Sequence, residues 1–97
     1  MKILVVDDDR HVLSLTSAIA ASAGYDTMEA CTGTEALELV ARARPDLVVL
    51  DVVLPDMSGF DVCKQIKAEP ALRNTLVALQ SGLSTSSEAQ TAGLAHR

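Results

Sequence analysis

The sequence predicts an α/β domain with an open, doubly wound parallel sheet. Three short apolar runs, residues 3–6, 47–50 and 76–79, are continuous rather than alternating, which is typical of strands covered on both faces. Amphipathic helical patterns separate these runs, and strands that alternate with helices favour right-handed crossovers and parallel pairing. With 97 residues, 48% of them hydrophobic, we expect one domain over residues 1–97 with a small aliphatic core.

The first strand, residues 3–6, leads into a predicted helix that ends at Gly24. Its apolar residues recur at spacings of three and four, which predicts a buried stripe made of Val12, Leu15, Ile19 and Ala23. Residues 25–30 form the next strand. Because Thr27 and Glu29 interleave with apolar residues there, we expect a half-exposed strand at the edge of the sheet.

Two further helices have N-terminal capping signals. Thr32 and Glu35 have the spacing of a capping box, and Pro45 limits the helix that follows. Ser58 and Asp61 predict the start of a helix that must end before a proline at position 70. After the strand at residues 76–79, a weaker helix is expected to follow a similar signal at residues 85–88.

The acidic balance limits the classes of partner. A net charge of -5 argues against nucleic acid and anionic membranes, because their phosphates attract the opposite sign. The opening apolar run is too short for a signal peptide or a membrane span and is followed at once by three aspartates. We therefore expect a cytoplasmic location, with Cys31 and Cys63 as reduced packing residues rather than a disulfide.

Acidic residues end two of the predicted strands. Asp7, Asp8 and Asp9 follow the first strand, and Asp51 follows the third. Ligands of such sheets bind beyond the carboxyl ends of the strands, so these groups are expected to converge if the two strands are neighbours. Crowded carboxylates repel one another unless a cation binds, and Mg²⁺ suits oxygen ligands. One carboxylate would then remain free to attack a phosphoryl group. For Asp9 alone, capping of the following helix is an equally good explanation.

These residues carry a family resemblance that runs from residue 2 to about residue 95. The segment 3–9, Ile-Leu-Val-Val-Asp-Asp-Asp, resembles the first strand of a two-component response-regulator receiver domain. The segment 47–59 resembles that family's phosphorylation-site segment, with the pattern Asp-x-x-x-Pro-x-x-x-Gly. The resemblance implies a flavodoxin-like (CheY-like) fold with strand order 2-1-3-4. We expect Gly59 to serve close backbone approach and Asp56 to face solvent.

The resemblance also implies a site and its partners. Asp51 would accept a phosphoryl group from a sensor histidine kinase or a phosphotransfer protein. Mg²⁺ would be held directly by Asp8, by Asp7 either directly or through water, and by the backbone carbonyl of Val53. The hydroxyl of Ser81 would hydrogen-bond the phosphoryl group. Such a domain is a regulatory switch with self-catalysed phosphoryl transfer, not a turnover enzyme.

The sequence departs from the family pattern near its end. We expect the fifth β-α unit to be missing, together with the lysine that follows the family's fifth strand, and neither Lys64 nor Lys67 is a convincing substitute. A sheet edge left exposed would invite pairing with another chain, so a homodimer is a further expectation.

Two alternatives stay open. One is an interaction or dimerisation module that is not phosphorylated. The other is a Mg²⁺-dependent aspartyl phosphatase, because Asp7 and Asp9 supply the Asp-x-Asp of haloacid-dehalogenase-like enzymes. That motif usually has Thr or Val where this chain has His11.

Overall fold

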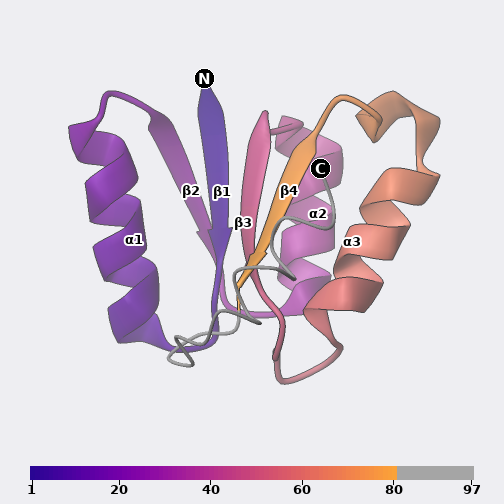
Figure 1. Ribbon diagram of the computed structural model, residues 1–97, viewed down its shortest axis with the longest axis horizontal. Coiled ribbons are helices and arrows are strands. Elements are labelled where there is room, and N and C mark those ends of the chain that lie inside the picture. Colours follow the sequence, from indigo (N-terminus) through magenta and orange to yellow (C-terminus); the bar gives the residue numbers. More distant parts are fainter. Residues whose placement is uncertain (81–97) are drawn as a thin grey trace.

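Four parallel strands and three α-helices form the described part of the molecule (Figure 1). The computed structural model describes residues 1–80, so Ser81 and the helix predicted near residues 85–88 lie outside the described residues. The elements alternate along the chain as predicted: β1 (Lys2–Val6), α1 (Arg10–Ser22), β2 (Asp26–Ala30), α2 (Gly33–Ala43), β3 (Leu47–Asp51), α3 (Gly59–Ala68), a 3-10 turn (Pro70–Leu72) and β4 (Leu76–Gln80).

The strand order is β2-β1-β3-β4, as predicted. β1 pairs in parallel with both β2 and β3, so that Val6 lies opposite Ala30 on one side and Leu50 on the other. β3 pairs in parallel with β4, with Asp51 opposite Gln80. Because the registers are aligned, the carboxyl ends of all four strands lie at one edge of the sheet.

The helices begin at the predicted capping residues. Thr32 accepts a hydrogen bond from the Glu35 amide (3.1 Å), and the Glu35 carboxylate accepts one from the Cys31 amide (2.7 Å). Ser58 likewise accepts from the amide of Asp61 (3.2 Å). These side chains satisfy backbone donors that have no partner within the helix, and so fix where each helix starts.

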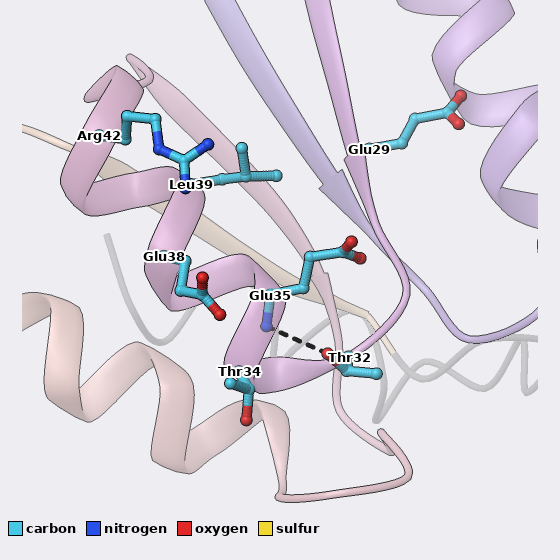
Figure 2. A pocket seen from close by; sticks show the side chains of 7 residues that line it. All are labelled: Glu29, Thr32, Thr34, Glu35, Glu38, Leu39 and Arg42. Atoms are coloured by element: carbon cyan, nitrogen blue, oxygen red, sulfur yellow. Dashed lines mark hydrogen bonds between the residues drawn. The ribbon is translucent and has the colours of Figure 1, made fainter.

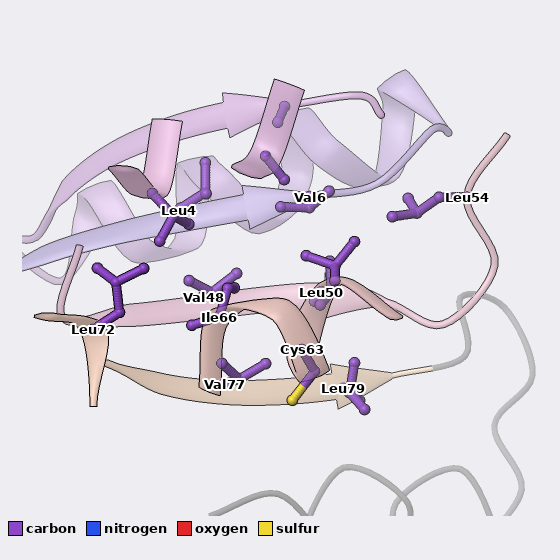
Figure 3. Close-up of a cluster of buried hydrophobic side chains, with 14 residues drawn as sticks. Leu4, Val6, Val48, Leu50, Leu54, Cys63, Ile66, Leu72, Val77 and Leu79 are labelled. Carbon is purple, nitrogen blue, oxygen red and sulfur yellow. The ribbon is translucent and has the colours of Figure 1, made fainter. Parts of the chain in front are cut away.

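The two faces of the sheet are covered unequally. In Figure 1, α2 and α3 lie on one face and α1 lies on the other. The larger buried cluster lies beneath α2 and α3 (Figure 3) and contains Leu4, Val6, Ala30, Ala36, Val40, Val48, Leu50, Leu54, Val62, Cys63, Ile66, Leu72, Val77 and Leu79. On the α1 face the buried hydrophobic residues of the described chain are Ile3, Val5 and Leu13. The prediction of burial on both faces is therefore confirmed for β1, whereas Leu47 and Val49 of β3 remain half-buried.

The predicted inward stripe of α1 is wrong. Leu13 and Ser17 are the buried residues of this helix, while Leu15 and Ile19 are 58% and 64% exposed. The observed face also has helical spacing but is rotated from the predicted one, and it presents a small residue, Ser17, among its contacts with β1 and β2. Small residues let a helix lie close to a sheet, and hydrophobic periodicity alone overlooks them.

A pair of identical substitutions in α1 tests which face is buried. Leu13→Ala is expected to lower the free energy of unfolding by about 2–5 kcal/mol, because it leaves a cavity in the smaller cluster. Leu15→Ala changes the same residue type in the same helix but is expected to cost no more than about 0.5 kcal/mol. Urea unfolding followed by circular dichroism measures both. Equal losses would show that the inward face is assigned wrongly.

Candidate metal centre

Three carboxylates meet at the edge of the sheet where β1 and β3 end. Asp7 and Asp8 directly follow β1, and Asp51 is the last residue of β3. One oxygen from each of these three side chains lies within 4.8 Å of the other two. Asp7 and Asp51 are only 1% and 6% exposed, whereas Asp8 is exposed to solvent. The predicted convergence of these acids is confirmed.

The hydrogen bonds of the buried acids leave one oxygen without a donor. Oδ1 of Asp7 accepts from the amide of Asp9 (2.9 Å), and Oδ1 of Asp51 accepts from the amide of Val53 (3.1 Å). Oδ2 of Asp7 is buried and has no hydrogen-bond partner among the described residues. A buried carboxylate oxygen without a donor is costly, and a cation satisfies it. An all-oxygen donor set of this kind fits Mg²⁺.

Burial sets the charge balance of the site. It raises the pKa of Asp51 above its ordinary value, the amide of Val53 opposes this shift, and the charges of Asp7 and Asp8 add to it. These causes penalise a third negative charge in the same place. A bound divalent cation would remove that penalty, which is the electrostatic reason for regarding this cluster as a metal centre.

Asp9 belongs to α1 rather than to the cluster. Its Oδ1 accepts from the amides of His11 (2.9 Å) and Val12 (3.3 Å), which makes it the N-cap of the helix. Capping was one of two explanations that the sequence left open, and the structure selects it. The three consecutive aspartates thus have different environments: one buried, one exposed and one bound to a helix terminus.

The loop after Asp51 is built on backbone contacts. Val53 faces Ser58 in an isolated antiparallel bridge, and the amide of Gly59 donates to the carbonyl of Val52 (2.7 Å). A Cβ added at Gly59 would overlap the carbonyl oxygen of Asp51 and lie 2.9 Å from Cα of Val52. The prediction that Gly59 permits close backbone approach is therefore confirmed. The side chain of Val53 is 69% exposed and is not part of the core.

Two lysine side chains donate hydrogen bonds to backbone carbonyls that lie far from the carboxylate cluster. Lys67 donates to the carbonyl of Thr75, just before β4 begins, and Lys2 donates to the carbonyl of Ala43 at the end of α2 (3.2 Å). Both acceptors precede strands, so they lie at the edge of the sheet opposite Asp51. This agrees with not assigning Lys67 to the site. Ser81, the remaining predicted site residue, lies outside the described residues.

Sequence reasoning missed one residue of this region, Asp56. It is exposed, as expected, but its carboxylate accepts hydrogen bonds from the amides of Gly33 (2.8 Å) and Thr34 (2.9 Å) and from the Thr34 hydroxyl (2.6 Å). These donors belong to the first turn of α2, more than twenty residues earlier in the chain. An aspartate in a loop has no sequence signal that distinguishes a solvated carboxylate from one that binds a distant helix.

A separate pocket lies beside α2 and contains none of the three clustered aspartates. It measures about 450 Å³ and is lined by Glu29, Thr32, Thr34, Glu35, Glu38, Leu39 and Arg42 (Figure 2). Five of these seven residues come from α2, whereas the carboxylate cluster is built from the ends of β1 and β3. The pocket is therefore not the candidate metal centre.

The fold and the site define a class: a doubly wound parallel α/β domain with an acidic cluster at the carboxyl ends of two adjacent strands. The family model for the response regulator receiver domain matches residues 3–96. The chain belongs to this family, and its fold is flavodoxin-like.

Relatives and solved structures agree with this assignment. The alkaline phosphatase synthesis transcriptional regulatory protein PhoP of Bacillus subtilis is 44% identical over 68 residues, covering 70% of this chain and 28% of that protein. The DNA-binding response regulator MtrA of Mycobacterium tuberculosis is also 44% identical over 68 residues, covering 70% of this chain and 30% of that protein. The chemotaxis response regulator CheY4 of Vibrio cholerae superposes with a TM-score of 0.84 at 32% identity, covering 97% of this chain and 78% of that one. The chain spans less than a third of the length of these curated relatives.

The close approach at Gly59 predicts an asymmetry between two glycines. Gly59→Ala is expected to cost about 1–3 kcal/mol of unfolding free energy, because backbone atoms on β3 and its loop must shift. In Gly33→Ala the new Cβ would overlap Cγ of Met57 and lie 2.7 Å from its Sδ and 3.1 Å from a Val62 methyl group, but the flexible Met57 side chain can move away. Its net cost should be smaller. Urea unfolding measures both variants, and a larger loss for Gly33→Ala would contradict this packing.

The bonds to Asp56 predict how its carboxyl titrates. The hydroxyl of Thr34, followed by the amides of Gly33 and Thr34, lowers the pKa of Asp56 from 3.8 to about 2. The stabilisation from these bonds is therefore fully present above pH 3.8 and is lost as the pH falls through about 2. A carboxyl ¹³C NMR titration should show this midpoint. Thr34→Val should raise it towards 3.8 and Thr34→Ser should not, whereas a midpoint of 3.8 in the parent would exclude the interaction.

Proposed function

We propose that this chain is the phosphoacceptor switch of a two-component system, with Asp51 as the residue that receives the phosphoryl group. The observation that carries the proposal is the meeting of Asp7, Asp8 and Asp51 at the ends of two adjacent parallel strands, with one oxygen of each within 4.8 Å. Family membership gives independent support. We further propose that residues 1–97 act as one receiver unit located in the cytoplasm. Among the described residues, no helix has the length and hydrophobicity needed to span a membrane.

The reaction assigned to Asp51 is a nucleophilic displacement at phosphorus. A carboxylate oxygen of Asp51 forms a bond to the phosphorus atom, and the bond from phosphorus to the donor breaks. The donor leaves as a histidine side chain when it is a histidine kinase or phosphotransfer protein, or as acetate when it is acetyl phosphate. The Val53 amide donates to Oδ1 of Asp51 and so orients the carboxylate, which leaves Oδ2 for the attack.

The residues that would hold Mg²⁺ are Asp8, Asp51, Asp7 either directly or through water, and the backbone carbonyl of Val53. When bound, the ion neutralises negative charge on the carboxylates and on the phosphoryl oxygens. The orphaned Oδ2 of Asp7 supports this assignment. Val53 lies in an extended bridge, where the amide and carbonyl of one residue point to the same side, and its amide donates to Asp51. This contact places the backbone of Val53 beside Asp51, which supports its assignment to the site.

A sensor histidine kinase or phosphotransfer protein would supply the phosphoryl group, and the hydroxyl of Ser81 would hydrogen-bond it once it is on Asp51. Phosphorylation replaces the single negative charge of the Asp51 carboxylate with about two on the phosphoryl group, and this added charge at a buried position contributes the free energy for a two-state response. Pairing of two copies through the sheet edge is a further possible output, and direct binding of nucleic acid is not expected for this acidic chain.

Incubation with acetyl phosphate tests the phosphoacceptor role. The parent with Mg²⁺ should gain the mass of one phosphoryl group, observed by intact-protein mass spectrometry. Asp51→Asn should gain none, because the attacking oxygen is lost. Omission of Mg²⁺ should abolish the adduct in the parent, because the crowded carboxylates then repel the incoming anion.

Asp61→Asn serves as the matched control, since it removes one carboxylate from the exposed surface of α3 and should be phosphorylated like the parent. A folded parent that gains no mass would contradict the proposal and favour an interaction or dimerisation module. Repeated turnover of a small phosphate ester would instead favour an aspartyl phosphatase.

A further inference from the structure

The loop between β3 and α3 is fixed at both ends, but its tip is exposed. At its start, the amide of Val52 donates to the carbonyl of Gln80 (2.8 Å) and the amide of Val53 donates to Asp51. At its end, Gly59 is held against the backbone of β3. Between these anchors Leu54 is buried in the core cluster and Met57 packs against it, whereas Pro55 and Asp56 are exposed.

Asp56 attaches this tip to a different element. The amides of the first three residues of α2 have no partner within the helix, whose first internal bond runs from the Ala36 amide to the Thr32 carbonyl (3.0 Å). The Thr32 hydroxyl accepts from the amide of Glu35 (3.1 Å). Asp56 accepts from the other two, those of Gly33 and Thr34, at 2.8 and 2.9 Å. The helix start is therefore complete only when the loop after Asp51 is in place.

The Thr34 hydroxyl makes this contact specific. In Figure 2, Thr34 projects from the first turn of α2 away from the hydrogen bond between Thr32 and Glu35. Its hydroxyl donates to Oδ2 of Asp56 (2.6 Å), the same oxygen that accepts from the Thr34 amide. A carboxylate at a helix N-terminus also interacts favourably with the helix dipole. Both carboxylate oxygens of Asp56 thus accept hydrogen bonds from one turn of α2. These bonds restrict the rotation of the Asp56 carboxylate as well as its position.

We propose that Asp56 is a positioning residue for the metal centre: by binding the N-terminus of α2 it holds the β3–α3 loop so that the Val53 carbonyl is in place to bind Mg²⁺. This inference rests on the proposed function, because it assigns a role towards the same ion. Only Leu54, which is buried in the core, and Pro55 separate Val53 from Asp56, so the bonds of Asp56 to α2 act together with the burial of Leu54 to hold the Val53 carbonyl in place. Groups that orient metal ligands without touching the ion change affinity by about 10–100-fold.

The negative charge of Asp56 could also raise the affinity for Mg²⁺ without any positioning of the loop. The variants must therefore separate the effect of this charge from the effect of the contact with α2. Asp56→Asn removes the charge together with part of the contact. Thr34→Val removes the hydroxyl donor while keeping the net charge and the side-chain shape. Asp26→Asn removes one exposed carboxylate from the start of β2, at the opposite edge of the sheet, and so measures the effect of net charge alone.

Mg²⁺ affinity is measured by isothermal titration calorimetry on the parent, the three single variants and the Asp56–Thr34 double variant. Asp56→Asn is expected to weaken binding about tenfold, and Thr34→Val by a smaller factor. The double variant should bind more tightly than the product of the two single effects predicts, because the contact between the two side chains can be lost only once. Asp26→Asn should bind nearly as the parent does. The amide resonance of Val53, recorded by NMR without metal, should move in both loop variants and stay in place in Asp26→Asn.

Contrary results of the Mg²⁺ titrations separate failure of the proposed function from failure of the positioning role of Asp56. If the parent itself does not bind Mg²⁺, the proposed function fails and this inference fails with it. If the parent binds and Asp56→Asn matches Asp26→Asn, or if the effects of the two loop variants simply multiply, Asp56 acts only through its charge and the positioning role is excluded. Urea unfolding without metal shows which variants are folded, and Thr34→Val decides the question if Asp56→Asn is not.

Discussion

The parallel pairing of β1 with β3 is the constraint on which the rest of the structure depends. Val6 lies opposite Leu50, so the next residue along each strand, Asp7 and Asp51, reaches the edge of the sheet at the same level. A slip of one residue would turn each side chain of β1 to the other face and separate the acids. Aliphatic side chains buried on both faces of β1 prevent such a slip, and thus hold together groups that repel one another.

The site itself is electrostatically unfavourable, and the surrounding backbone only partly compensates. Burial and the two neighbouring charges raise the pKa of Asp51, while one amide from Val53 opposes them. Asp7 receives one amide and retains a buried oxygen without a donor. A site organised only for stability would have paired these groups or replaced them. The remaining imbalance favours the divalent cation that the proposed function requires.

The loop after Asp51 connects the site to the helices on the larger face of the sheet. Gly59 lets α3 begin directly against the backbone of β3, and Asp56 completes the first turn of α2. The opposite face is arranged differently: α1 contributes one large buried side chain, Leu13, and leaves Leu15 and Ile19 exposed. The site is therefore joined to α2 and α3 through this loop, and to the start of α1 through the amide of Asp9, which donates to Asp7.

The sequence alone determined the element order, the helix caps at Thr32 and Ser58, the parallel sheet and the meeting of Asp7, Asp8 and Asp51. The order, the caps and the parallel pairing follow from local signals or from a topological rule that applies to all such sheets, whereas the meeting of the acids also needs β1 and β3 to be neighbours, which the family resemblance implied. Only the tertiary structure decided which face of α1 is buried, that Asp9 caps a helix, and that Asp56 binds α2. These outcomes depend on contacts between residues distant in the sequence, or on a choice between two local roles of equal propensity. An exposed aspartate and an aspartate bound to a distant helix terminus read the same in a sequence, because the partner that distinguishes them is supplied by the fold.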